Sequence, residues 1–251
     1  MTVEPAVSVG AGQRPGAVTP GMVREMFLRG DVQQTGRQVA SLASKIFPCD
    51  AAAVLVVQHG VITPAAATDR AAGRASELQL VCSEGPSVDA VSGRRHSVVD
   101  DLRVESRWRF WAPQAAQLGW RSVVSVSLAD DGILGVVSLY SRRPHGFTAE
   151  DLALLEVFAQ HAALALTVAD DRVQLRRAVE ARTLIGQAQG VLMQRYQIDA
   201  DQAFMVMRRY SSHRNRKLRL VAEDIVRDRC LLAPPGRESD REEPGRDRPT
   251  V

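Results

Sequence analysis

The most informative stretch of this 251-residue chain is Ser122-Val-Val-Ser-Val-Ser-Leu-Ala-Asp-Asp-Gly-Ile-Leu-Gly-Val-Val-Ser-Leu-Tyr140. Its two ends, 122–128 and 134–140, are rich in the β-branched and apolar residues that are typical of strands. Between them lies Asp131-Gly132, a dipeptide that favours a tight turn between antiparallel strands. The stretch therefore predicts a β-hairpin and, with it, an antiparallel sheet.

Helical and strand patterns alternate upstream of this hairpin. Residues 22–47 place apolar side chains at helical spacing, with breaks expected at Gly30 and Gly36. Two apolar runs flank His59-Gly60 and predict a second pair of strands, over 51–58 and 61–68. Helices are expected over 71–81 and 108–118, and a short strand over 97–99. Helices interleaved with hairpin-connected strands predict an α+β domain with a mostly antiparallel sheet.

A long helix is predicted directly after the sheet. Thr148 and Asp151 have the spacing of a capping box, and neither Gly nor Pro follows until Gly186. Apolar residues along this helix alternate at spacings of three and four, as in a coiled-coil seam. They are Leu152, Leu155, Ala159, Ala162, Leu166, Ala169 and Val173. The stripe has two interpretations, packing on the domain's own sheet or dimerisation with a second copy, and both can hold in succession along the helix.

Positive charge is concentrated near the C-terminus. Residues 182–233 hold 10 basic and 5 acidic side chains, whereas residues 1–181 hold 18 and 19. Six cations lie between Met205 and Leu220 with no acid among them: Arg208, Arg209, Arg214, Arg216, Lys217 and Arg219. A solvated helix face usually mixes both signs, because like charges at neighbouring positions repel. The acid-free set therefore predicts a polyanionic partner, and nucleic acid is the common one.

The same segment has the pattern of a three-helix bundle. The expected helices run from Thr183 to about Tyr196, from Ala200 to about Ser212, and from residue 216 or 218 to Val226. Asp199 and Gln202 repeat the capping-box spacing at the start of the second helix. The expected core is Leu192, Met193, Ala203, Leu218, Val221, Ala222 and Ile225, with Ala188 and Gly190 as small packing residues.

Motifs in residues 25–168 resemble a GAF domain. They include Ser83-Glu84-Gly85-Pro86, Val99-Asp100-Asp101-Leu102, Gly119-Trp120-Arg121-Ser122-Val123 and the closing helix from Phe147. The resemblance implies a sensory module with an antiparallel sheet, helices on one side and a ligand pocket on the other. It names no ligand, so the cofactor stays unknown. Where related proteins often carry Gly-Pro-Cys, this chain has Gly85-Pro86-Ser87, which removes a potential redox or metal-binding thiol.

The C-terminal segment resembles an ANTAR domain, the RNA-binding module of transcription antitermination regulators. The matching motifs are Ile185-Gly186-Gln187-Ala188-Gln189-Gly190-Val191-Leu192-Met193, Asp201-Gln202-Ala203-Phe204, and Ser211-Ser212-His213-Arg214-Asn215-Arg216-Lys217-Leu218-Arg219. The resemblance implies that this domain binds hairpins in mRNA leaders. A three-helix basic bundle also fits a DNA major groove, and it is the resemblance that favours RNA.

Roles for single residues follow from this resemblance together with their chemistry. The six cations would neutralise phosphates. Ser211, Ser212, His213 and Asn215 would contact base edges or sugars. Tyr196 and Tyr210 either stack on unpaired bases or are half-buried tyrosines of the bundle.

The chain thus divides into a disordered arm (1–21), a sensor domain (22–168), a helical connector (169–181), an RNA-binding domain (182–233) and a disordered tail (234–251). No catalytic residues and no metal site are expected, because the three cysteines are far apart and no catalytic constellation is present. No membrane span or secretory signal is expected, which indicates a cytoplasmic protein. We expect a homodimeric antitermination regulator with a small-molecule or protein signal. The alternative is a DNA-binding or protein-interaction adaptor.

Overall fold

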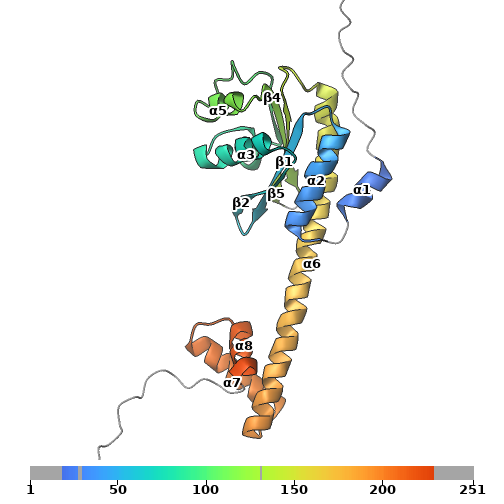
Figure 1. The fold of residues 1–251 in the computed structure, drawn as a ribbon. Coiled ribbons are helices and arrows are strands. Elements are labelled where there is room, and N and C mark those ends of the chain that lie inside the picture. Colours follow the sequence, from blue (N-terminus) through green and yellow to red (C-terminus); the bar gives the residue numbers. More distant parts are fainter. Residues whose placement is uncertain (1–18, 28–29, 131, 229–251) are drawn as a thin grey trace, which may run out of the picture. The chain divides into compact units, whose positions relative to one another are not determined.

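The computed structural model describes residues 19–27, 30–130 and 132–228, so nearly all of the predicted arm and the whole predicted tail lie outside it. The chain divides into two compact units between Gln174 and Leu175. The first unit contains a five-stranded sheet and its helices, and the second is helical (Figure 1). The elements are α1 (Pro20–Met26), α2 (Val32–Ile46), β1 (Ala51–Gln58), β2 (Val61–Ala67), α3 (Arg70–Cys82), α4 (Pro86–Val91), β3 (His96–Val99), α5 (Trp111–Gln117), β4 (Ser122–Ala129), β5 (Ile133–Ser141), α6 (Ala149–Tyr196), α7 (Ala200–His213) and α8 (Leu218–Asp228).

The sheet has the order β2-β1-β5-β4-β3, and every neighbouring pair is antiparallel. The predicted hairpin is the β4–β5 pair, in which Val124 lies opposite Leu139. Strand β5 is central, and it approaches β1 so closely at Gly135 that a Cβ there would lie 2.3 Å from the Leu55 carbonyl oxygen. The predicted α+β class is confirmed.

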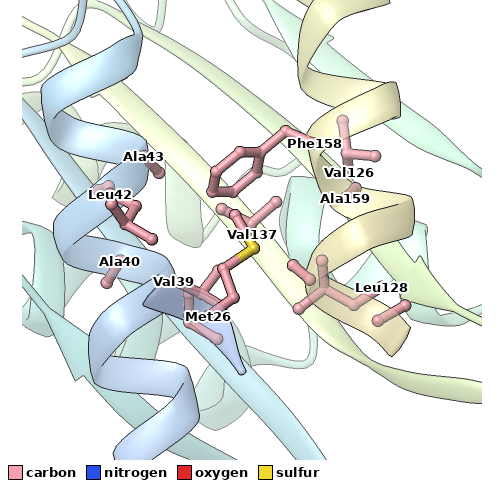
Figure 2. Packing of buried hydrophobic residues seen from close by; sticks show 14 of the residues in the cluster. Met26, Val39, Ala40, Leu42, Ala43, Val126, Leu128, Val137, Phe158 and Ala159 are labelled. Carbon is pink, nitrogen blue, oxygen red and sulfur yellow. The ribbon is translucent and has the colours of Figure 1, made fainter. Parts of the chain in front are cut away.

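Helices α1, α2 and α6 cover one face of the sheet. Figure 2 shows this core, where Met26, Val39 and Phe158 meet strand residues such as Val137 and Leu128. Phe158 of α6 packs edge-on against Phe47, with ring centroids 5.6 Å apart. Since all these side chains are almost fully buried, this face supplies a large share of the hydrophobic stabilisation of the first unit.

Helices α3, α4 and α5 lie on the other face, so helices cover both sides of the sheet and not one side, as the resemblance had implied. Three tryptophans and a tyrosine fill this second core: Trp108, Trp111, Trp120 and Tyr140. The physical reason is visible in the strands, since β1 and β4 are buried at nearly every position and not at alternate positions.

One local prediction on this domain needs correction. Gly36 does not break the first helical segment; it lies inside α2, where a Cβ would come 2.7 Å from the Cβ of Ala65 on β2. This glycine therefore allows the helix to lie close to the sheet, whereas the break does fall at Gly30, between α1 and α2. The short helix α4 was not predicted.

Helix α6 starts where the capping box predicts. The Thr148 hydroxyl accepts a hydrogen bond from the Asp151 amide at 3.1 Å, and the Thr148 amide donates to the Asp151 carboxylate at 2.8 Å. The helix then runs for 48 residues without a break. The predicted first helix of the C-terminal bundle, from Thr183, is therefore the continuation of α6 and not a separate element.

The heptad stripe of α6 faces the domain's own core. Leu155, Ala159, Ala162, Leu166 and Ala169 are at most 2% exposed and belong to the cluster of Figure 2. Of the remaining two positions, Leu152 packs against this cluster and Val173 is partly exposed. The stripe therefore packs on the domain's own sheet, which is the first of its two interpretations.

Helix α6 is also the one described helix that is long and apolar enough to cross a membrane. Its most apolar window has a mean hydropathy of 1.7, and 44% of that window is buried within the protein. A core helix of a folded domain has the same properties, and the buried stripe of α6 is of this kind.

The second unit is a small helical bundle made by the end of α6, α7 and α8. The predicted capping box of α7 is present, with the Gln202 amide donating to Asp199 at 2.7 Å. Its core consists of Ala188, Leu192, Ala203, Met207, Val221, Ala222 and Ile225. Met193 was predicted in this core but is 36% exposed, and a Cβ at Gly190 would touch nothing within 4 Å. Neither residue is therefore a packing residue of this bundle.

Candidate nucleic-acid interface

The connection between α7 and α8 is a fixed turn. Asn215 has a φ of 47°, in the left-handed region that Asn tolerates better than most residues. The Ser211 hydroxyl donates to the Arg216 carbonyl at 2.5 Å, and the Arg216 amide donates to the Ser211 carbonyl at 3.0 Å. These hydrogen bonds between Ser211 and Arg216 close the turn and so fix where α8 begins.

Two of the six predicted cations are already engaged within the protein. The Arg216 guanidinium lies 2.5 Å from the carboxylate of Asp224 on α8. The Arg214 guanidinium lies over the Tyr210 ring, 5.4 Å from its centroid, and its Nη2 is buried without a hydrogen-bond partner. These two side chains help to hold the turn together, and a polyanion would have to compete for them.

The other four cations are exposed, and none of them forms an ion pair within the described part of the chain. They are Arg208 and Arg209 on α7, Lys217 just before α8, and Arg219 in its first turn. We call these four residues the basic surface. Because no described acid pairs with them, these four side chains keep their positive charge available for an anionic partner.

Sequence reasoning missed Asp224. The window from Met205 to Leu220 is free of acids along the chain, but the fold brings Asp224 from the middle of α8 back onto Arg216. Asp224 also lies 3.6 Å from Arg227. No periodicity in the sequence could indicate this ion pair, because Arg216 lies outside any helix and Asp224 follows it by eight residues.

The polar residues of the predicted site divide in the same way. Ser212, His213 and Asn215 are exposed, whereas the Ser211 hydroxyl is used within the turn. Ser212 follows Arg208 by four residues and His213 follows Arg209 by four, so each pair shares a face of α7. These pairs place a cation beside a side chain that can form hydrogen bonds.

The two tyrosines differ. Tyr196, the last residue of α6, is 48% exposed, so its ring is accessible from solvent. Tyr210 packs against the bundle core and carries Arg214 on its ring, so the half-buried interpretation describes it better.

The interior of the first unit contains a polar network on the face covered by α3 and α4. Here the Ser87 hydroxyl lies 2.9 Å from that of Ser138, which lies 2.7 Å from that of Ser125. The Tyr140 hydroxyl lies 2.9 Å from Ser76 Oγ, and its burial raises the pKa of the phenol to about 12. Ser87, which stands where related proteins often carry a cysteine, is therefore a buried serine whose hydroxyl has a hydrogen-bond partner.

Among the described residues, no group of three or more His, Cys, Asp or Glu side chains is arranged to hold a metal ion. Burial raises the pKa of the Cys49 thiol to about 12, so this thiol stays protonated at neutral pH.

Comparison with known protein families matches both units of the chain. The GAF domain model matches residues 30–167, and the ANTAR domain model matches residues 173–226. A GAF domain from a phosphoenolpyruvate-protein phosphotransferase of Coxiella burnetii is similar in fold, with a TM-score of 0.52 and 16% identity over 61% of this chain and 93% of that one. A GAF domain region of a membrane protein from Geobacter sulfurreducens has 23% identity over 55% of this chain and 93% of that one, with a TM-score of 0.47. A comparison with curated proteins found no significant match.

The two family matches thus identify a sensor module followed by an RNA-binding type of module. The chain belongs to the GAF domain family and carries an ANTAR domain at its C-terminal end. At the level of these families it is a signal-regulated RNA-binding regulator.

Proposed function

We propose that this protein is a transcription antitermination regulator whose ANTAR domain binds hairpins in mRNA leaders under the control of a signal received by the GAF domain. The observation that carries the proposal is the basic surface, four exposed cations on one small bundle that form no ion pair with any described residue. Helix α8 begins beside Lys217 and adds the positive end of its dipole to the same place. We place the protein in the cytoplasm, without a membrane anchor and without an enzymatic activity of its own.

The proposal includes a homodimer, because two linked domains can bind two neighbouring hairpins at once. Linking two sites makes the second contact intramolecular and raises the overall affinity by roughly 10²–10⁴-fold. The heptad stripe that suggested a dimer is occupied by the core of its own domain. A dimer must therefore use another face of the protein.

A second apolar stripe on α6 fits this role. We call it the outer stripe: Val157, Leu164, Val168, Leu175 and Val179. Val157, Leu164, Leu175 and Val179 are 47–67% exposed, which is unusual for such side chains on one helix. Valine recurs at 157, 168 and 179, and leucine at 164 and 175, so the repeat is eleven residues.

An eleven-residue repeat corresponds to about 3.67 residues per turn, which keeps a stripe almost parallel to the helix axis. In a parallel pair of identical helices, each residue of such a stripe meets its own copy. The outer stripe is therefore suited to a second copy of this chain.

The direct test is binding to RNA and to DNA of the same sequence at matched salt concentrations. The probe is an RNA with two adjacent hairpins, enriched on the full-length protein from a library with random loops. We expect the RNA to bind more tightly, and the double variant R208A/R209A to lose affinity. The matched control, R94A/R95A, removes two arginines from the sensor domain and should bind as the wild type does.

Equal or tighter binding of the DNA would favour a DNA-binding adaptor. If no RNA is enriched above the level of the R208A/R209A variant, the protein-interaction alternative replaces the RNA proposal.

A further inference from the structure

A cavity of about 200 Å³ lies beside the segment of α6 that ends the first unit. Its apolar wall is formed by Val57 at the end of β1, Leu134 at the start of β5, and Leu166 on α6. Leu166 is buried, and the other two are partly exposed. The cavity therefore offers an aliphatic pocket that is open to solvent at one side.

This cavity is distinct from the interior of the sensor domain beneath α3 and α4. It is bounded by the start of α2, by α6 and by the turn between β1 and β2, and none of its lining residues belongs to α3, α4 or α5. The Ser87 and Tyr140 network lies on the other face of the sheet. A molecule in the cavity would not compete with a ligand of that network.

Its polar side is dominated by one carboxylate. Asp170 Oδ2 accepts a hydrogen bond from Gln174 Nε2 at 2.6 Å, and no ion pair of Asp170 occurs among the described residues. The cation nearest in sequence, Arg172, donates to the Phe27 carbonyl at 3.3 Å. Residues two apart on a helix do not face each other, so Arg172 does not neutralise Asp170.

Two other polar side chains line the cavity. Gln58 lines it from the end of β1 and His59 from the turn. An amide offers hydrogen bonds without charge, so the carboxylate of Asp170 decides which charge is preferred. A carboxylate beside an apolar wall attracts a cation more strongly than one in bulk water, because the local dielectric constant is lower.

We infer that this cavity binds a small organic cation, an ammonium group on a short aliphatic body. The ammonium would sit against Asp170 and Gln58, and the aliphatic part would cover Leu134 and Leu166. The volume lies below the roughly 300–1,000 Å³ of pockets for drug-sized molecules, which limits the ligand to a small metabolite.

Such a ligand would contact the β1–β2 turn and also the part of α6 that ends the first unit, because Gln174 lines the cavity and is the final residue of that unit. The same helix continues into the ANTAR domain. If the proposed function holds, the cavity is placed where a ligand can act on the helix between sensor and output. The binding itself does not depend on that function.

The experiment is a methyl NMR titration of the full-length protein with n-butylammonium chloride, following Val57, Leu134 and Leu166. Pentanoate and pentan-1-ol serve as the anionic and uncharged counterparts of similar length. We expect saturable shifts with butylammonium in the millimolar range, as five heavy atoms allow. Pentanoate should produce none, and pentan-1-ol should bind more weakly.

Two aspartate variants separate the site from general attraction. Asp170→Asn should weaken butylammonium binding at least tenfold, whereas Asp171→Asn changes an exposed neighbour that does not line the cavity and should have no effect. Leu134→Trp should block the cavity and abolish the shifts.

The inference is overturned if butylammonium produces no saturable shift up to about 50 mM, or if the two aspartate variants weaken it equally. Binding that survives Leu134→Trp also overturns it, since the ligand would then lie elsewhere. None of these measurements uses RNA, so a failure of the antitermination proposal would leave them unaffected, and the reverse holds too.

Discussion

At the scale of single residues, Arg216 and Lys217 are adjacent cations with different surroundings. Arg216 is paired with Asp224 at 2.5 Å, and Lys217 has no ion pair among the described residues. Each phosphate contact contributes roughly 0.7–0.9 to the slope of log affinity against log salt. We predict that Lys217→Ala flattens the slope by about this amount and that Arg216→Ala flattens it by less than half as much.

The measurement is RNA affinity at several salt concentrations, with circular dichroism to confirm folding. The control is Glu223→Ala, which removes an exposed acid 3.8 Å from Arg227 and should leave affinity unchanged or slightly higher. Equal slopes for the wild type and the Lys217 variant would remove Lys217 from the interface.

Gly135 is the residue at which two strands come closest. An added methyl group would meet the backbone oxygen of Leu55 at 2.3 Å, and backbone in the centre of a sheet cannot move aside cheaply. We predict that Gly135→Ala lowers the free energy of unfolding by about 1–3 kcal/mol, as overpacking in a core does. Urea unfolding is the measurement.

Gly132 provides the matched control, because a Cβ there meets nothing within 4 Å. Gly132→Ala should change stability by less than about 0.5 kcal/mol, as surface substitutions usually do. If both variants are equally stable, the sheet has more freedom at β5 than its packing indicates.

At the scale of elements, α6 carries two apolar stripes with different tasks. Leu166 is 2% exposed within the core, whereas Leu164, two residues earlier, is 49% exposed on the outer stripe. Leu166→Ala should cost about 2–5 kcal/mol of stability, because it leaves a cavity in a packed core. Leu164→Ala should leave the stability of the fold nearly unchanged and weaken the proposed dimer.

Urea unfolding measures the loss of stability in Leu166→Ala. Light scattering over a range of protein concentrations measures the weakening of the dimer in Leu164→Ala. The quadruple variant V157Q/L164Q/L175Q/V179Q should be a folded monomer. A dimer that survives these four changes would place the contact on another surface.

The comparison of sequence with structure is also clearest at the level of elements. The hairpin of β4 and β5, the capping boxes of α6 and α7 and most of the bundle core follow from local sequence patterns, and these were predicted from the sequence alone. What failed depends on partners distant in the chain. The role of Gly36 depends on Ala65, and the state of Arg216 depends on Asp224. The α6 stripe was left with two interpretations, and the choice between them depends on α2 and the sheet.

The candidate site was predicted as a segment but not as a surface. All six cations were found from charge alone, because a run without acids is visible in any sequence. Which cations are already bound within the protein depends on side-chain contacts near the turn at Asn215. There Arg214 lies over Tyr210 and Arg216 pairs with Asp224, whereas the other four form no ion pair with a described residue. A local pattern can locate such a site, while the fold decides which groups remain available.

At the scale of the whole molecule, the two units have separate cores on one continuous helix. The core of the first unit uses α6 up to Ala169, and that of the second begins at Leu184. From Asp171 to Glu180 every residue except Val173 is exposed. This arrangement allows each unit to fold by itself, with α6 as a solvated connection.

We therefore predict two separate unfolding transitions in calorimetry of the full chain. Leu166→Ala should shift only the transition of the first unit, and Met207→Ala, which truncates a fully buried side chain of the bundle, should shift only that of the second. The bundle transition should lie lower, because a domain of this size buries little of its surface. RNA should raise the bundle transition alone, as expected for a ligand that binds only that folded unit. A single cooperative transition that both variants shift equally would mean that α6 couples the two cores, so that signal and output would share one folding equilibrium and not merely one helix.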